Sequence, residues 1–203
     1  KKDLDRLFSC IDYTNRLSLA GGEIFLHSHY KELFKYIGEN YRNKIGTLSV
    51  TTSTVILPDD ETFLLFKKYG FTIHVSDYRS SGMPGIEKKY RSFVEKLEEF
   101  QVDYVLFEDH EWLDLDVFRE KEMYMVEQEK IDHFDACGIP WGYYRDGKLW
   151  PCAWHALAVE AGVKPECETD YYDLRSCTVE KETIEGGKIT FEFQQEKCKE
   201  LME

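Results

Sequence analysis

The sequence contains no uninterrupted run of about 18 apolar residues, the length that a membrane-spanning helix needs. It also has no excess of basic side chains, because 39 acidic residues outnumber 26 basic ones and give a net charge of −13. A general nucleic-acid-binding or anionic-membrane-binding surface needs a basic face. The composition therefore predicts neither a nucleic acid nor a membrane as a partner.

Several common signals of other protein classes are missing as well. There is no Gly-x-Ser-x-Gly motif, no phosphate-binding loop and no dinucleotide fingerprint, which excludes the commonest α/β enzymes. The charged start of the chain does not resemble a signal peptide. Six cysteines in 203 residues are too few for a disulfide scaffold. Reduced thiols, a metal role for some of them and a cytoplasmic location are expected.

What the sequence does contain is a regular alternation of helical and strand-like segments in its first half. Tyr30, Leu33, Phe34, Ile37 and Tyr41 form an apolar stripe at helical spacing, and similar patterns predict helices near 58–69 and 86–97. Strand-like runs stand between them at residues 16–20, 46–52, 71–75 and 102–107. An alternation of this kind predicts an α/β fold, with parallel strands joined by helical crossovers.

The pattern changes in the second half. Asp146-Gly147 lies between two short strand-like runs, 143–145 and 148–150, which is a strong signal for a β-hairpin. A second hairpin is expected to turn at residues 185–188. We therefore predict two domains, an α/β domain over residues 1–130 and a small, hairpin-rich α+β extension over residues 131–203.

The most distinctive short motif is Gly21-Gly22-Glu23, at the carboxyl end of the first predicted strand. Ligands collect at the carboxyl ends of parallel strands. Two glycines there allow a ligand to approach the backbone closely, and a carboxylate can receive an ammonium group. The alternative interpretation is an ordinary flexible turn between a strand and a helix.

Three segments together resemble the radical S-adenosylmethionine (radical SAM) enzyme superfamily. LSLAGGEIFLH resembles the Gly-Gly-Glu segment that follows the second barrel strand of that family. LSVTTSTVI stands where the family commonly has a strand ending in a Ser/Thr-Asn-Gly-Thr turn, and FTIHVSDYR matches the next strand. The three occur in the family's order, and the resemblance covers roughly residues 1–110. It implies a partial (β/α)6 barrel that binds S-adenosylmethionine (SAM).

The resemblance also implies roles for individual residues. Gly21-Gly22 and Glu23 would bind the methionyl amino group of SAM, with Glu23 as the anionic partner. Thr52 and Ser53 would lie at the strand-end turn that faces the cofactor. This sequence departs from the family at that turn, because Ser53-Thr54 replaces the usual Asn-Gly.

Two further residues follow from the third segment. Ser76 would hydrogen-bond the ribose or the carboxylate of SAM, and Arg79 would pair with a carboxylate of the cofactor or the substrate. Ordinary turn chemistry and a solvated charge are the alternatives for these two side chains. No residue is assigned a catalytic role.

The family's Cys-x3-Cys-x2-Cys loop, which holds its catalytic [4Fe–4S] cluster, does not occur in this sequence. We expect it upstream of Lys1, so that the chain is a barrel fragment without the first strand and the cluster loop. The spacing of Leu4, Leu7, Phe8 and Ile11 predicts a first helix. Cys10 stands alone on it, and we interpret it as a buried thiol.

A second metal site is expected at Cys137 and Cys152. Their spacing, Cys-x9-Gly-x4-Cys, flanks the predicted hairpin and brings the two thiols together. It resembles the opening of the SPASM or twitch extensions, which hold auxiliary [4Fe–4S] clusters behind many radical SAM barrels. Two structural cysteines or a zinc site remain the alternatives.

The expected function is therefore that of a radical SAM enzyme. The resemblance implies reductive cleavage of SAM to a 5′-deoxyadenosyl radical, a peptide, sugar or other small metabolite as substrate, and flavodoxin or ferredoxin as electron donor. The competing hypotheses are a non-catalytic α/β module that binds SAM or another ligand, and a zinc-binding structural protein.

Overall fold

The structure is a computed structural model that describes residues 1–107, 128 and 142–175. The described residues form two compact units. The sheet unit contains Lys1 and residues 12–107, and the hairpin unit contains Lys2–Ile11 together with residues 142–175. The predicted turn at residues 185–188 lies outside the described residues.

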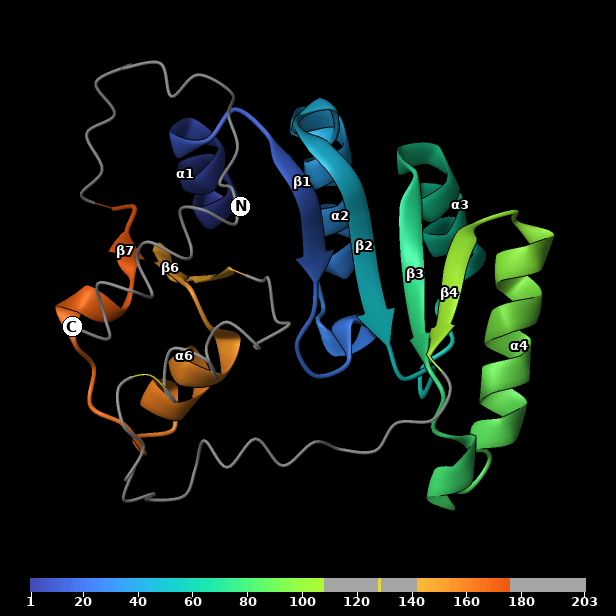
Figure 1. Cartoon of the computed structure of the whole chain (residues 1–203). Helices are drawn as coiled ribbons and strands as arrows, with labels where there is room; N and C mark the ends of the chain where they lie inside the picture. The colour runs from blue at the N-terminus through green and yellow to red at the C-terminus, as the bar shows by residue number, and fades with distance from the viewer. Residues whose placement is uncertain (108–127, 129–141, 176–203) are drawn as a thin grey trace. The chain divides into compact units, whose positions relative to one another are not determined.

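The sheet unit is built on four parallel strands whose spatial order is also their order along the chain, β1-β2-β3-β4 (Figure 1). Matched pairs such as Leu17 with Leu48 and Val50 with Ile73 set the register. The strands are β1 (Thr14–Leu19), β2 (Ile45–Thr52), β3 (Phe71–Ser76) and β4 (Asp103–Phe107). The predicted α/β fold with parallel strands is confirmed.

Each crossover between these strands contains a helix, as the apolar stripes predict. The helix α3 shows how the sequence sets its ends. The Asp59 side chain accepts a hydrogen bond from the Thr62 amide at the start, and Gly70 takes a left-handed conformation at the end. The helices and short 3-10 turns of the unit are η1 (Ile24–Leu26), α2 (Tyr30–Asn40), η2 (Arg42–Lys44), α3 (Asp60–Tyr69), η3 (Arg79–Ser81) and α4 (Ile86–Glu99).

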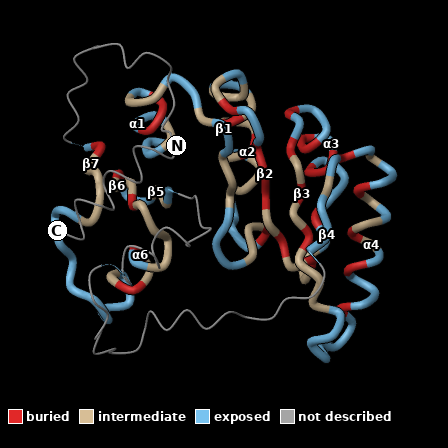
Figure 2. The backbone as a smooth tube through the Cα atoms, in the orientation of Figure 1, coloured by how far each residue is buried: buried red, intermediate tan, exposed pale blue. Residues whose placement is uncertain are grey.

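The core of the sheet unit lies between the sheet and its helices. Figure 1 shows α2 and α3 on the same side of the sheet, and ring contacts bring α4 into the same layer. Phe63 of α3 lies 5.5 Å from Phe93 of α4, between ring centroids, and Phe66 lies 5.5 Å from Phe71 of β3. Figure 2 shows the buried residues concentrated along β2, β3 and the helix faces. The helices therefore cover one face of the sheet.

The hairpin unit contains a small antiparallel sheet of three strands, in the order β5-β6-β7. Asp146 and Gly147 both have positive φ, 51° and 79°, as a two-residue hairpin turn requires. The predicted hairpin is confirmed. Its elements are β5 (Tyr143–Arg145), β6 (Lys148–Trp150), α6 (Ala153–Glu160), η4 (Glu168–Asp170) and β7 (Tyr172–Asp173).

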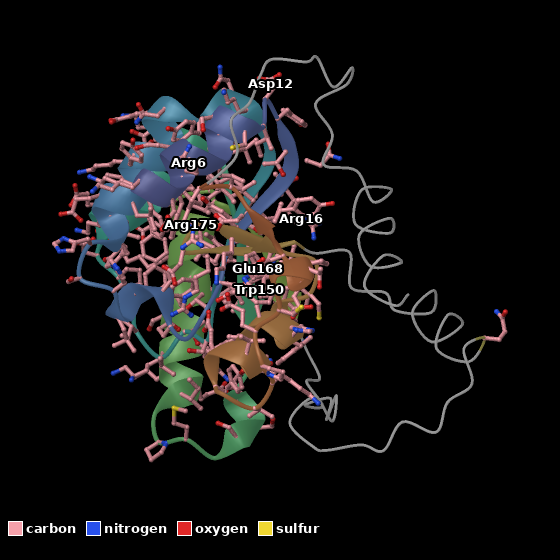
Figure 3. All side chains as sticks on the ribbon, turned by 90° about the vertical axis from the view of Figure 1, so that its left-hand side faces the viewer. Arg6, Asp12, Arg16, Trp150, Glu168 and Arg175 are labelled. Carbon is pink, nitrogen blue, oxygen red and sulfur yellow. The ribbon has the colours of Figure 1, made fainter. Side chains whose placement is uncertain are left out.

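The first helix, α1 (Lys2–Cys10), belongs to the hairpin unit although it begins the chain. Its Leu7 and Phe8 side chains are buried. Arg6 donates a hydrogen bond of 3.3 Å to the carbonyl of Arg175, and both residues are labelled in Figure 3. The two ends of the described chain therefore meet in one unit.

Candidate functional site

The Gly21-Gly22 turn follows the carboxyl end of β1, and both glycines are exposed. Gly21 has a φ of 130°, which strongly favours glycine. Gly22 has no such requirement, and a Cβ atom at either position would have no neighbour within 4 Å among the described residues. Neither packing nor backbone conformation accounts for the glycine at position 22. A ligand that approaches this backbone closely would account for it.

Glu23 joins this turn to the end of the neighbouring strand. Its carboxylate accepts hydrogen bonds from the Thr52 hydroxyl at 2.9 and 3.0 Å, from the Ser53 amide at 3.0 Å and from the Ser53 hydroxyl at 2.6 Å. It also caps η1 through the Phe25 amide at 3.4 Å. The structure therefore brings together all five predicted site residues of β1 and β2, which are Gly21, Gly22, Glu23, Thr52 and Ser53.

Thr54 stands where the family's turn has glycine, and its φ is 61°. That left-handed conformation is costly for a β-branched residue. The side chain is fully buried, and its hydroxyl has no hydrogen-bond partner among the described residues. The Thr54 amide donates to the Thr52 hydroxyl oxygen at 3.1 Å, which fixes the direction in which that hydroxyl points. The backbone at Thr54 thus has the left-handed conformation that glycine adopts most easily.

Replacing Thr54 with glycine is expected to raise the free energy of unfolding by about 1 kcal/mol. The gain comes from relief of the left-handed strain and removal of an unpartnered buried hydroxyl. The loss of a buried methyl group and the greater freedom of glycine in the unfolded chain offset part of it. Urea unfolding measures the change, and a variant less stable than the wild type contradicts it. Gln101→Gly is the matched control for backbone strain alone. Gln101 also has a left-handed φ, 54°, but its side chain is exposed.

The third strand ends beside the second. Thr52 pairs with Val75 in the register, so Ser76 follows at the same edge as Ser53. Arg79 forms an ion pair with Asp77, to which its Nε and Nη2 atoms donate hydrogen bonds of 3.0 and 2.6 Å. Its guanidinium also lies 4.4 Å from the Tyr90 ring centroid. This ion pair raises the pKa of Arg79 further above its ordinary value. A ligand carboxylate would meet the other edge of the guanidinium.

His74 is a candidate that the sequence interpretation missed. It lies on the face of β3 opposite the helices, as Ser76 does, because buried Ile73 and Val75 point to the helix side. Burial, and after it the charge of Arg16, lowers the pKa of His74 below its ordinary range. The alternation of polar and apolar residues along 71–76 was the available signal.

The predicted metal site is described only in part. Cys137 lies outside the described residues. Cys152 is half-buried and stands at the N-cap of α6, directly after the confirmed hairpin. His155, in the first turn of that helix, contacts Asp170 at 3.0 Å between Nε2 and Oδ2. Within residues 1–107 and 142–175, no three or more His, Cys, Asp or Glu side chains converge to hold a metal ion.

The chain matches no protein-family model, no curated protein and no solved structure. In the part of the chain that the structure describes, no helix has the length and apolar character needed to cross a bilayer.

Proposed function

We propose that this chain contributes the SAM-binding part of a radical SAM enzyme, and that its sheet unit is a segment of a (β/α)6 barrel. Two features of the sheet support the barrel. Its strands follow one another in chain order, and its helices cover one face. A doubly wound sheet instead reverses its strand order and carries helices on both faces.

The observation that carries the proposal is the meeting of the three family-like segments at one edge. Glu23 of the first segment bonds to Thr52 and Ser53 of the second, and Ser76 of the third follows beside them. The open Gly21-Gly22 backbone lies at this edge. These residues fit a ligand with a small polar end group, such as the methionyl part of SAM.

The bound group would supply chemistry that the side chains do not. A SAM molecule held at a [4Fe–4S] cluster would supply one-electron reductive cleavage, with methionine and a 5′-deoxyadenosyl radical as the products. The cluster ligands would come from outside the described residues. We propose an electron donor such as flavodoxin or ferredoxin and a peptide, sugar or other small metabolite as substrate. Cys137 and Cys152 are proposed as ligands of an auxiliary cluster.

The test is cleavage of SAM by the full-length gene product after anaerobic reconstitution with iron and sulfide. We expect 5′-deoxyadenosine and methionine to form on reduction with dithionite. Gly22→Val should reduce this activity about a hundredfold, because its side chain would occupy the ligand's space. Its melting temperature should stay near that of the wild type, because the added atoms meet open space. Ser28→Val, at an exposed position in the same loop, is the matched control.

Two results would contradict the proposal. A reconstituted wild-type protein that binds iron but neither binds nor cleaves SAM would exclude a radical SAM function. Equal activity in Gly22→Val and Ser28→Val would show that no ligand approaches the turn.

A further inference from the structure

The hydrogen-bonding capacity of the Glu23 carboxylate is already used by the chain itself. A carboxylate offers about four acceptor sites. Four donor groups point at this one: the Thr52 hydroxyl, the Ser53 amide, the Ser53 hydroxyl and the Phe25 amide. The Thr52 hydroxyl is shared between both oxygens, at 2.9 and 3.0 Å. An incoming ammonium group would have to displace one of these donors.

The donors are themselves held in place. Thr52 is 1% exposed, and its hydroxyl oxygen accepts the Thr54 amide, so its proton is directed toward Glu23. The Ser53 amide belongs to the backbone that directly follows β2. By contrast, the Gly21-Gly22 turn has no side chain of its own to pack. The bonds of Glu23 are therefore side-chain contacts that join this turn directly to the end of β2.

We infer that Glu23 is a positioning residue, which clamps the glycine turn to the end of β2, and that Thr52 and Ser53 act on the ligand through Glu23 rather than by touching it. This assignment differs from the role that the family resemblance implies for the three side chains. It rests on the proposed function for its ligand, SAM. The turn's backbone is then the surface that the ligand's polar end meets.

The first test follows the turn without any ligand. Hydrogen exchange of the backbone amides of residues 21–23 is measured in the full-length protein. Thr52→Val and Ser53→Ala should each accelerate exchange about tenfold, because each removes a donor that holds the clamp. Ser53→Thr keeps the hydroxyl and should exchange as the wild type does. Thr47→Val, at an exposed position in the same strand, is the matched control.

The second test separates positioning from direct contact by a double-mutant cycle in the reconstituted full-length protein. Glu23→Gln places an amide NH2 against donors and should weaken SAM binding about tenfold, as should Thr52→Val. The double variant should bind no more weakly than Glu23→Gln alone. KM for SAM should rise while kcat at saturating SAM changes little. Affinity for 5′-methylthioadenosine, which lacks the amino and carboxylate groups of the methionyl part, should not change.

The outcomes distinguish the positioning role of Glu23 from the proposed SAM-binding function. A further tenfold loss in the double variant would show that Thr52 touches SAM and would overturn the positioning role. Wild-type exchange in Thr52→Val and Ser53→Ala would overturn it as well. If the wild-type protein does not bind SAM, the proposed function fails, whereas the exchange measurement still decides whether Glu23 fixes the turn.

Discussion

Replacing Phe66 with alanine is expected to lower the free energy of unfolding by about 4 kcal/mol, the largest loss among the substitutions considered for this protein. Phe66 is fully buried at the centre of the aromatic core. Its ring centroid lies 5.4 Å from that of Phe34 in α2 and 5.5 Å from that of Phe71 in β3. The substitution therefore removes contacts to a helix and a strand at once and leaves a cavity that rigid rings cannot fill.

Chemical denaturation, monitored by far-UV circular dichroism, measures this loss. The matched control is Leu64→Ala in the same helix, because Leu64 is 57% exposed and has little packing to lose. We expect the control to change stability by less than about 1 kcal/mol. Similar losses in the two variants would show that α3 does not pack on the sheet through the Phe66 face.

Replacing Gly38 with alanine is expected to cost about 3 kcal/mol, although alanine normally stabilises a helix. Gly38 lies in α2 against the ring of Tyr69. A Cβ atom at this position would stand 2.3 Å from Cγ and from Cδ1 of that ring, well inside contact distance. The ring cannot move away freely, because it is buried and its hydroxyl donates to Glu39 at 3.1 Å.

A double-mutant cycle identifies the clash as the cause. In a Tyr69→Ala background, Gly38→Ala should cost nothing or stabilise the protein by about 0.5 kcal/mol, since only the helix propensity of alanine remains. Urea unfolding of the four proteins gives the coupling energy. An equal penalty in both backgrounds would mean that the glycine is needed for a reason other than its contact with Tyr69.

The sheet unit could be predicted well because its local signals agree with its tertiary structure. The strands β2 and β3 are rich in β-branched residues, and an aspartate cap and a glycine mark the two ends of α3. Gly70 ends α3 in the left-handed conformation that its place in the sequence predicts. The predicted strands at residues 71–75 and 102–107 differ by a single residue from the observed ones.

The hairpin unit was less predictable because its signals are short or absent. The helix α6 is apolar nearly all round, so no helical stripe marks it. The strand β7 has only two residues and is defined by its pairing with β6. Nothing in the sequence around α1 indicates that it joins residues 142–175, since that association depends on contacts far apart in the chain.

The candidate site was predictable as a location but not as a set of contacts. The carboxyl ends of parallel strands had to meet, so the sequence placed Glu23 near Thr52 and Ser53. That all four donors converge on one carboxylate depends on where β2 ends and on the side-chain rotamers there. Thr54 shows the same limit, because a sequence pattern can indicate a glycine-like turn but not that threonine adopts its backbone conformation.

The membership of α1 in the hairpin unit has a consequence for the order of folding. The strands β1 to β4 pair with their neighbours in sequence, so each can join the sheet soon after it is synthesised. The contact of Arg6 with Arg175 instead closes a separation of 169 residues. The entropy cost of closing this long loop is larger than that of pairing neighbouring strands. In addition, Arg175 emerges from the ribosome after the whole sheet. The helix α1 precedes the sheet in the sequence, but its contact with Arg175 can form only after the sheet has been made.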